Sequence, residues 1–294
     1  MGGAIQSIEY MKSRLVDSNA DRLNKIERNE TVVVGVNKFT NGEPSPLTAG
    51  EGGIMVVDPA VEHDQINRLT RWRANRDQAA VNAALLALRT AAQNGENVMP
   101  PSIAAAKAGV TTGEWAAEMR AVFGEYRGPT GVSRSVSNKT EGLDDIRDAV
   151  DAVSKKLGRR LSFLVGKPGL DGHSNGAEQI AFRARDCGMD INYDGIRLTP
   201  DQLIEAAKEN NPHVIGLSIL SGSHLPLVQD VITKMRANAL DHVPLIVGGI
   251  IPDDDAKRLI EMGVARVYTP KDFELNTIMM DIVTLADPQS IAAQ

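Results

Sequence analysis

The sequence predicts an α/β fold, with a doubly wound, five-stranded parallel sheet in the C-terminal half and a mostly helical segment before it. Three observations lead to this prediction. After residue 160, five short apolar runs alternate with five helical patterns, as in a parallel sheet with helical crossovers. Hydrophobic residues make up 42% of the chain and aromatic residues only 4%, so Ala, Val, Ile and Leu must build the core, which favours a helix-covered sheet. The 294 residues are enough for two domains at roughly 150 residues each.

The N-terminal half is predicted to be mostly helical. Apolar residues at a period of about 3.6 indicate a helix over 4–27, and a long helical pattern covers about 61–93. Another helix begins at Thr111, where the sequence Thr-Thr-Gly-Glu forms a capping box. The Val-rich run at 31–36 is typical of a short buried strand, and a Gly/Pro-rich loop follows it at 41–53.

The C-terminal half shows the alternation that predicts the sheet. The expected order is strand 161–166, helix 176–187, strand 191–194, helix from Thr199, strand 213–219, helix to about 237, strand 244–249, helix from Pro252, strand 264–269 and a last helix. Residues 127–138 are rich in Gly, Ser and Pro and are predicted to be a linker. We therefore expect a mostly helical segment at 1–127, a linker and linker helix at 128–157, and a ligand-binding domain at 158–294.

Charge and cysteine content argue against several classes of function. The formal net charge is −6, and residues 161–294 hold 11 basic against 18 acidic residues, so we expect no nucleic-acid partner. No apolar stretch reaches about 18 residues and the N-terminus lacks the layout of a signal peptide, so we expect no membrane partner. The single cysteine, Cys187, is interpreted as a small buried hydrophobe. A chain without disulfides suits a reducing, cytoplasmic location.

Polar or glycine-rich sequences follow three of the predicted strands, at the edge where doubly wound sheets bind ligands. They are Lys167–Gly176, Ser218–His224 and Gly248-Gly249. The phosphate-binding P-loop and the dinucleotide fingerprint are both absent from the sequence. The third strand also ends without the acidic residue that a receiver domain needs. Flavin binding stays open on pattern alone.

The spacing of Asp171 and His173 suggests a metal ligand. A carboxylate two residues before an imidazole can accept its ring N–H, which fixes the tautomer and makes the other nitrogen a better donor. No second His, Cys or carboxylate lies at ligand spacing, so these residues cannot build a zinc site. A single histidine ligand suits a metal that arrives with its other ligands attached, as in a macrocycle.

These residues carry a resemblance to a known family. Asp171-Gly-His173-Ser-Asn-Gly176, then after 41 residues Ser218-Ile-Leu220, then after 27 residues Gly248-Gly249, resembles the D-x-H-x-x-G…S-x-L…G-G signature of cobalamin-binding domains. Lys167 lies four residues before Asp171, as in acyl-CoA mutases, and residues 31–127 look like the segment that joins a mutase's substrate barrel to its cobalamin domain. The chain is thus similar over essentially its whole length to the C-terminal portion of a cobalamin-dependent acyl-CoA mutase, in the methylmalonyl-CoA mutase family. The sequences LSGSHLPLV and VYTPKDFELN most resemble the ethylmalonyl-CoA mutase branch, with methylmalonyl-CoA mutase next.

The resemblance implies that residues 1–127 are a barrel C-terminal remnant with a helical segment and that residues 158–294 are a flavodoxin-like cobalamin-binding domain. It also implies a role for each residue of the signature. His173 would be the lower axial ligand to cobalt, in place of the cofactor's own dimethylbenzimidazole. Asp171 would orient His173, and Lys167 would interact with Asp171. Ser218 would hydrogen-bond the displaced base, with Leu220 beside it. The glycines that would leave room for the nucleotide tail between the first and third strands are Gly172, Gly176, Gly248 and Gly249.

The implied reaction is a radical isomerisation of the carbon skeleton with adenosylcobalamin, in which ethylmalonyl-CoA becomes methylsuccinyl-CoA. The adenosyl–cobalt bond breaks homolytically, the radical abstracts a substrate hydrogen, and the carbonyl-CoA group migrates. A substrate barrel needs on the order of 250 residues, whereas only 160 precede the cobalamin domain. We therefore expect no catalytic residue in this chain and an acyl-CoA that binds to a missing barrel or large subunit. A truncated chain, a truncated reading frame, a natural small subunit and a homodimer all stay open.

Two functions of other classes also stay open. A corrinoid carrier for methyl transfer uses the same signature behind a helical cap, and residues 61–127 are helical enough to form one, although the run at 31–36 argues against it. A non-catalytic cobalamin sensor should carry a DNA-binding or partner-switching element, and the sequence shows no such motif. Outside the signature, we expect His224 at the surface or as a helix cap, and Asp253–Asp255 as partners of a helix dipole.

Overall fold

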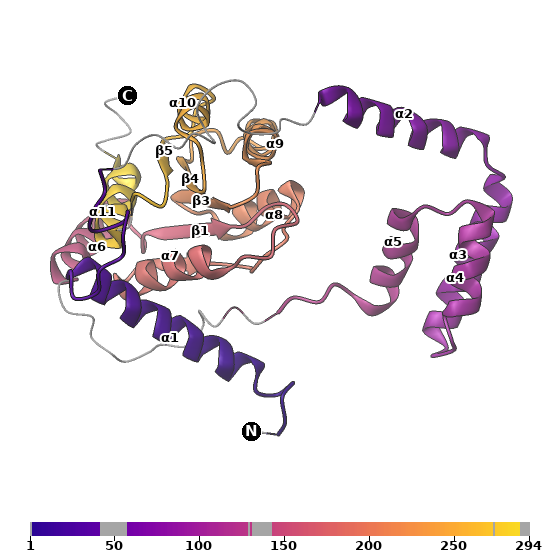
Figure 1. The fold of residues 1–294 in the computed structure, drawn as a ribbon, viewed down its shortest axis with the longest axis horizontal. Coiled ribbons are helices and arrows are strands. Elements are labelled where there is room, and N and C mark those ends of the chain that lie inside the picture. Colours follow the sequence, from indigo (N-terminus) through magenta and orange to yellow (C-terminus); the bar gives the residue numbers. More distant parts are fainter. Residues whose placement is uncertain (1, 42–57, 129, 131–142, 273, 289–294) are drawn as a thin grey trace. The chain divides into compact units, whose positions relative to one another are not determined.

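The computed structural model describes residues 2–41, 58–128, 130, 143–272 and 274–288. The chain divides into two compact units (Figure 1). One consists of residues 43–126, and the other combines residues 1–42 with 127–294. Each unit is described by itself.

The described part of residues 43–126 is helical. Its helices are α2 (Pro59–Asn75), α3 (Gln78–Gln93), α4 (Met99–Ala108) and α5 (Thr112–Phe123). The single helical pattern predicted over about 61–93 is therefore two helices with a break between them. The break has a local cause, because the Asp77 carboxylate accepts hydrogen bonds from two backbone N–H groups in the first turn of α3 and caps it. The capping box predicted at Thr111 is confirmed.

The second unit contains the predicted sheet. Its strands are β1 (Ser162–Gly166), β2 (Asp190–Asn192), β3 (Val214–Ile219), β4 (Leu245–Gly249) and β5 (Arg266–Tyr268). All pair in parallel, in the order β2-β1-β3-β4-β5. This is the flavodoxin-like order, so the predicted fold class is confirmed. The strand order reverses between β1 and β3, which places the expected ligand site at their carboxyl ends.

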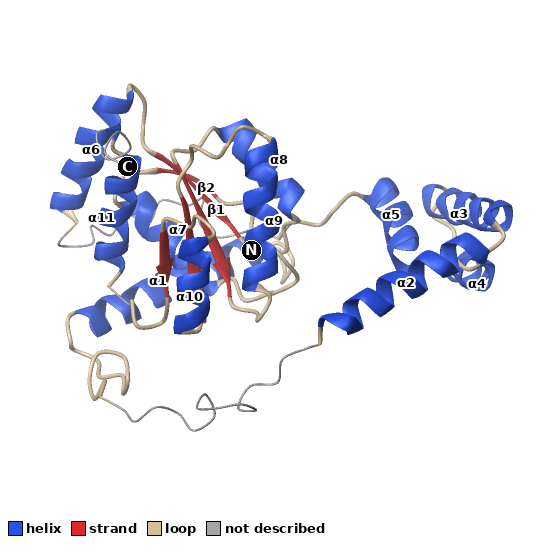
Figure 2. Ribbon diagram, turned by 90° about the horizontal axis from the view of Figure 1, so that it is seen from above, coloured by secondary structure: helices blue, strands red, loops and turns tan. Residues whose placement is uncertain are grey.

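Helices cover both faces of the sheet (Figure 2). One face packs against α6 (Asp144–Leu157), α7 (Asn175–Asp186) and α11 (Leu275–Ala286), and the other against α8 (Pro200–Asn210), α9 (His224–Ala237) and α10 (Asp253–Glu261). Successive strand residues serve opposite faces, so Phe163 and Val165 join the first core and Leu164 the second. All of β1 is buried, and apart from Ser162 its sequence is apolar, as expected for a strand covered on both faces.

The helix predicted over 4–27 is α1 (Ile8–Glu27), and it packs against α7. The helical period agrees with the prediction, but only part of the apolar face of the helix is buried. Val16 and Ile26 are buried, whereas Met11 is 47% and Leu15 59% exposed. Periodicity identifies a helix and an apolar stripe, but the contact with α7 decides which part of the stripe is covered.

The prediction of a buried strand over 31–36 is wrong. This segment forms an isolated bridge between Val34 and Lys38 instead, and Val34 is 74% exposed. Among the described residues, no neighbouring strand pairs with the backbone groups of this segment. The side chain of Asn37 hydrogen-bonds to some of them instead. The Asn37 amide accepts from Val33 N and donates to the carbonyls of Ile26 and Thr31.

Two predicted loops lie largely or wholly outside the described residues. They are the Gly/Pro-rich sequence at 41–53 and the linker at 127–138. Among the helices that the structure describes, none combines the length and the apolar character needed to cross a membrane.

Candidate functional site

The candidate site lies at the carboxyl edge of the sheet, where β1, β3 and β4 end. Lys167 follows β1, Ser218 lies near the end of β3, and Gly248 and Gly249 close β4. Ser218 and Gly248 are register partners in the sheet, so these loops meet because of strand order. The structure therefore brings the three parts of the sequence signature to one edge.

Lys167, Asp171 and His173 form a hydrogen-bonded chain. The Lys167 side chain is 0% exposed, and its Nζ donates to Asp171 Oδ2 at 2.8 Å and to the Ser218 carbonyl at 3.4 Å. Asp171 Oδ1 lies 2.6 Å from His173 Nδ1 and also accepts from the His173 backbone N–H at 3.0 Å. Lys167 thus connects the loop after β1 to β3 by hydrogen bonds. The Asp171 carboxylate is hydrogen-bonded to both the backbone and the ring of His173.

The electrostatics favour an ionised Asp171. Burial alone would raise its pKa, but the hydrogen bonds from Lys167 and His173 outweigh that effect and hold the pKa of Asp171 well below its usual range. An ionised carboxylate only accepts hydrogen bonds, so His173 Nδ1 is the donor in this contact and Nε2 is the nitrogen not bonded to Asp171. The His173 side chain is 82% exposed, which leaves Nε2 free to act as a donor to a metal.

A shallow cavity of about 620 Å³ lies beside this imidazole. Asp171, His173, Leu220, Ser221 and Asp230 are among its lining residues. Leu170, at the tip of the same loop, is 92% exposed although it is apolar. An exposed imidazole and an exposed leucine at one rim suit contact with a large, partly apolar ligand.

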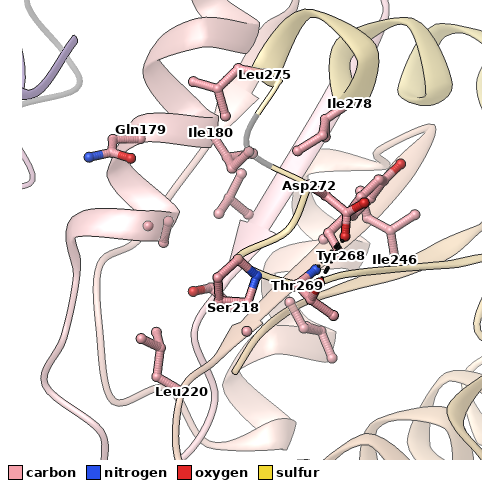
Figure 3. Close-up of a pocket in the computed structure, with 18 of the residues that line it drawn as sticks. Gln179, Ile180, Ser218, Leu220, Ile246, Tyr268, Thr269, Asp272, Leu275 and Ile278 are labelled. Atoms are coloured by element: carbon pink, nitrogen blue, oxygen red, sulfur yellow. Dashed lines mark hydrogen bonds between the residues drawn. The ribbon is translucent and has the colours of Figure 1, made fainter. Parts of the chain in front are cut away.

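A second, mostly apolar pocket of about 300 Å³ opens between the ends of β1, β3 and β4, α7 and α11. Figure 3 shows Ile180, Leu275 and Ile278 towards one end of it and Ser218 and Leu220 towards the other. The predicted residues that line it are Gly176, Ser218, Leu220, Gly248 and Gly249. Leu220 lines both hollows, so they adjoin at this residue.

The absence of a side chain has a different physical consequence at each glycine of the signature. A Cβ at Gly176 or Gly248 would meet no atom nearer than 3.9 Å, so these two glycines leave open space in the pocket. A Cβ at Gly249 would collide with the Ile219 carbonyl oxygen, so the close approach of β3 already requires glycine there. Gly172 lies in the loop near Arg197 and is absent from the pocket lining that the structure describes.

Several pocket residues were not identified from the sequence. They are Leu23, Ile180, Tyr268, Leu275 and Ile278. Each lies in a predicted helix or strand, but hydrophobic periodicity does not separate a residue that lines a pocket from one that fills the core. Tyr268 contributes its ring, and its hydroxyl donates to Asp281 at 2.9 Å.

The expectation for His224 needs correction. It is only 4% exposed, and its Nε2 lies 2.9 Å from Asp255 Oδ2, in the first turn of α10. It therefore connects the first residue of α9 to the first turn of α10, rather than lying at the surface. Among the described residues, no group of three His, Cys, Asp or Glu side chains could hold a metal ion by itself. His173 stands as a single exposed donor.

Comparison with known proteins adds to this geometry. Residues 1–125 match the family described as methylmalonyl-CoA mutase, and residues 161–272 match the B12 binding domain. An ethylmalonyl-CoA mutase of Cereibacter sphaeroides is 69% identical, over 100% of this chain and 45% of the relative. An ethylmalonyl-CoA mutase of Methylorubrum extorquens is 54% identical, over 98% of this chain and 42% of the relative. A methylmalonyl-CoA mutase of Escherichia coli is 33% identical, over 96% of this chain and 40% of the relative. The chain thus spans less than half the length of these relatives.

Proposed function

The chain belongs to the methylmalonyl-CoA mutase family, and on that premise we propose that it is the cobalamin-binding portion of an adenosylcobalamin-dependent acyl-CoA mutase. The observation that carries the proposal is the chain from buried Lys167 through Asp171 to the exposed imidazole of His173. It lies at the switch point of the sheet, beside an apolar pocket. The proposed binding mode has the cofactor's own base displaced and His173 in its place.

The residues present suit such a cofactor. Base-off binding needs one protein nitrogen directed at the metal and a separate apolar space for the displaced base. His173 offers the nitrogen, and the pocket of about 300 Å³ offers the space. Gly176 and Gly248 keep that space open, and the Ser218 hydroxyl supplies a polar group within an otherwise mostly apolar lining.

Each residue of the chain has a distinct part in the proposed mechanism. Lys167 keeps Asp171 ionised, and Asp171 holds the proton on His173 Nδ1 so that Nε2 can ligate cobalt. Leu220 would separate the face of the corrin ring from the pocket, because it lines both hollows. The bound cofactor would supply a carbon–cobalt bond that breaks homolytically to start radical chemistry. The protein's part here is to bind, orient and exclude water.

The substrate follows from similarity rather than from the site. Identities of 69% and 54% to ethylmalonyl-CoA mutases, against 33% to a methylmalonyl-CoA mutase, support conversion of ethylmalonyl-CoA to methylsuccinyl-CoA. Methylmalonyl-CoA is the runner-up substrate. A corrinoid carrier is the runner-up of another class, and the match of residues 1–125 to the mutase family weighs against it.

Electron paramagnetic resonance tests the proposal directly. The 294-residue chain, with ¹⁵N-labelled histidine, is loaded with cobalamin reduced to Co(II), and the splitting from the axial nitrogen is recorded. We expect a splitting that follows the protein label and disappears in His173→Ala. His242→Ala is the matched control, because His242 is an exposed histidine of the same unit.

Two outcomes would contradict the proposal. Cobalamin that binds without a histidine splitting would rule out the His173 ligand and favour a base-on carrier. A folded chain that binds no cobalamin would overturn the proposed function altogether. Circular dichroism of the same sample establishes that the chain is folded.

A further inference from the structure

Helix α1 is joined to the cobalamin-site helix α7 by a partly buried ion pair. Glu178, in the first turn of α7, is only 5% exposed, and Lys12 Nζ lies 2.6 Å from its Oε1. The same Nζ donates to Ser174 Oγ at 3.3 Å, one residue after His173. A buried carboxylate needs such a partner, because an unpaired buried charge is strongly destabilising. The start of α7, and with it the His173 loop, therefore depends on a residue of α1.

Helix α1 is also joined to α11, on the other side of the apolar pocket. Arg183 of α7 is 4% exposed, and it donates to Asn24 Oδ1 of α1 at 2.8 Å and to Asn276 Oδ1 of α11 at 2.5 Å. Glu27 Oε1 accepts from the backbone N–H of Leu275 at 3.1 Å, at the first residue of α11. No side chain of α11's own N-cap does this, so α1 supplies the missing acceptor.

Between these two anchors, α1 places Leu23 in the wall of the pocket. Leu23 lines this pocket, as do Ile180 of α7 and Leu275 and Ile278 of α11. Figure 3 shows these last three residues towards one end of the pocket. Leu23 is also packed against the core that α7 and α11 share with the sheet. It lies outside residues 161–272, which match the B12 binding domain, and inside residues 1–125, which match the mutase family.

We propose that α1 is a structural part of the cobalamin site, in which Leu23 closes the pocket that receives the nucleotide tail. Lys12, Asn24 and Glu27 hold the helix in position for that role. The inference rests on the proposed function, because it assigns the pocket to the tail of cobalamin. It makes Leu23 a specificity-determining residue, since only a corrinoid that carries a tail would contact it.

The test compares two corrinoids on the same protein. Cobalamin carries the nucleotide tail, and cobinamide has the corrin ring without it. Dissociation constants for both are measured by absorbance titration on the 294-residue chain and on Leu23→Asp, Leu23→Ala and Leu15→Asp. Leu15→Asp is the matched control, because Leu15 lies on the same helix but is 59% exposed. Circular dichroism of each apo chain reports whether it is folded.

We expect the wild-type chain to prefer cobalamin to cobinamide. In Leu23→Asp the affinity for cobalamin should fall about tenfold or more, because a carboxylate enters an apolar pocket, while the affinity for cobinamide stays the same. Leu23→Ala should lose less affinity for cobalamin than Leu23→Asp does. Leu15→Asp should keep the wild-type ratio of the affinities for cobalamin and cobinamide. A role of Leu23 in folding alone would lower both affinities together.

The outcomes separate this inference from the function on which it rests. The inference is overturned if the ratio of the two affinities is unchanged in both Leu23 variants, whether both affinities stay the same or both fall equally. A wild-type chain that binds the two corrinoids equally also overturns it, because the tail then makes no use of the pocket. A wild-type chain that binds neither corrinoid overturns the proposed function itself, and the inference with it.

Discussion

At the scale of single residues, Asp171 is the centre of the candidate site. It joins a fully buried lysine to a largely exposed imidazole, and it fixes which nitrogen of that imidazole faces outward. The hydrogen bonds from Lys167 to Asp171 and from His173 to Asp171 are strongest when Asp171 is ionised. The lowered pKa of Asp171 keeps its carboxyl group ionised. In the proposed binding mode, His173 would supply the donor atom, and Asp171 would orient it.

Replacing Asp171 by asparagine should therefore weaken cobalamin binding while leaving the ligand in place. We expect Asp171→Asn to lose about 10–100-fold in affinity, the usual cost of removing the residue that orients a metal-bound histidine. The measurement is an absorbance titration with cobalamin. Asp230→Asn is the control, because Asp230 is an exposed carboxylate that lines the same cavity. Equal affinities for the two variants would contradict the role assigned to Asp171.

The single cysteine also belongs to this scale. Cys187 is 0% exposed, and burial raises the pKa of its thiol to about 11. A thiol with that pKa is almost entirely protonated at neutral pH and is a poor nucleophile. The prediction of a small buried hydrophobe is confirmed.

At the scale of elements, the start of α5 shows how one carboxylate can connect three segments. Glu114 completes the capping box with Thr111, and the Arg76 guanidinium donates to its two oxygens at 2.6 and 2.7 Å. The hydrogen bond from Arg76 is the largest influence on Glu114, and together with those from Thr111 it outweighs desolvation and lowers the pKa of Glu114 to about 2. Arg76 also donates to the Gly109 carbonyl, so α2, α4 and α5 meet at this carboxylate.

Replacing Glu114 by glutamine should destabilise the helical unit. Glutamine can still complete the capping box, but it loses the ion pair with Arg76, which costs up to about 1 kcal/mol and lowers the melting midpoint of a unit of this size by up to about 4–8 °C at pH 7. Tryptophan fluorescence is the readout, because both tryptophans of the chain, Trp72 and Trp115, lie in this unit. Glu62→Gln, an exposed change in the first turn of α2, is the control and should leave the midpoint unchanged.

The difference in melting midpoint between wild type and Glu114→Gln should depend on pH, and the pKa of Glu114 gives the direction. The folded-state pKa of Glu114, about 2, lies below the value of about 4.3 expected in the unfolded chain. Its stabilisation is therefore complete above about pH 4.3 and is lost as the pH falls towards 2. The melting midpoints of wild type and Glu114→Gln should converge over that interval. A constant difference down to pH 2 would show that the carboxylate charge is not what stabilises the junction.

At the scale of the whole molecule, the proposed chemistry needs more than this chain. The relatives to which it is most similar are more than twice its length. The structure supplies a candidate cofactor site, whereas the acyl-CoA is expected to bind to a barrel or large subunit outside this chain. Binding of the cofactor and conversion of the substrate can therefore be tested separately.

We expect the purified chain to bind adenosylcobalamin and to leave ethylmalonyl-CoA unconverted. Chromatography of the CoA esters, after incubation with the loaded chain, is the measurement. Binding is followed in the same sample by gel filtration, so a negative result for turnover is not a failure to load. Appreciable formation of methylsuccinyl-CoA would contradict this expectation and would place a substrate site within these 294 residues.

The sequence by itself determined the class of fold and the main residues of the candidate site. Strand–helix alternation predicted the parallel sheet, the capping box at Thr111 located the start of α5, and the helix expected from Thr199 begins there as α8. The spacing of Asp171 and His173 predicted the contact between them. These features succeed because they are local: a cap, a strand or an i, i+2 contact depends on residues that are neighbours along the chain.

Only the tertiary structure decided which distant segments meet. Leu23 lines the pocket with residues at least 140 positions away. His224 contacts Asp255 on another helix, and Lys12 neutralises buried Glu178. The Val-rich run at 31–36 has the composition of a strand, but it has no neighbouring strand in the described structure and remains a turn with one bridge. The physical reason is the same in each case. Composition and period say that a side chain favours burial or a partner, but the chain topology decides which surface or partner it meets.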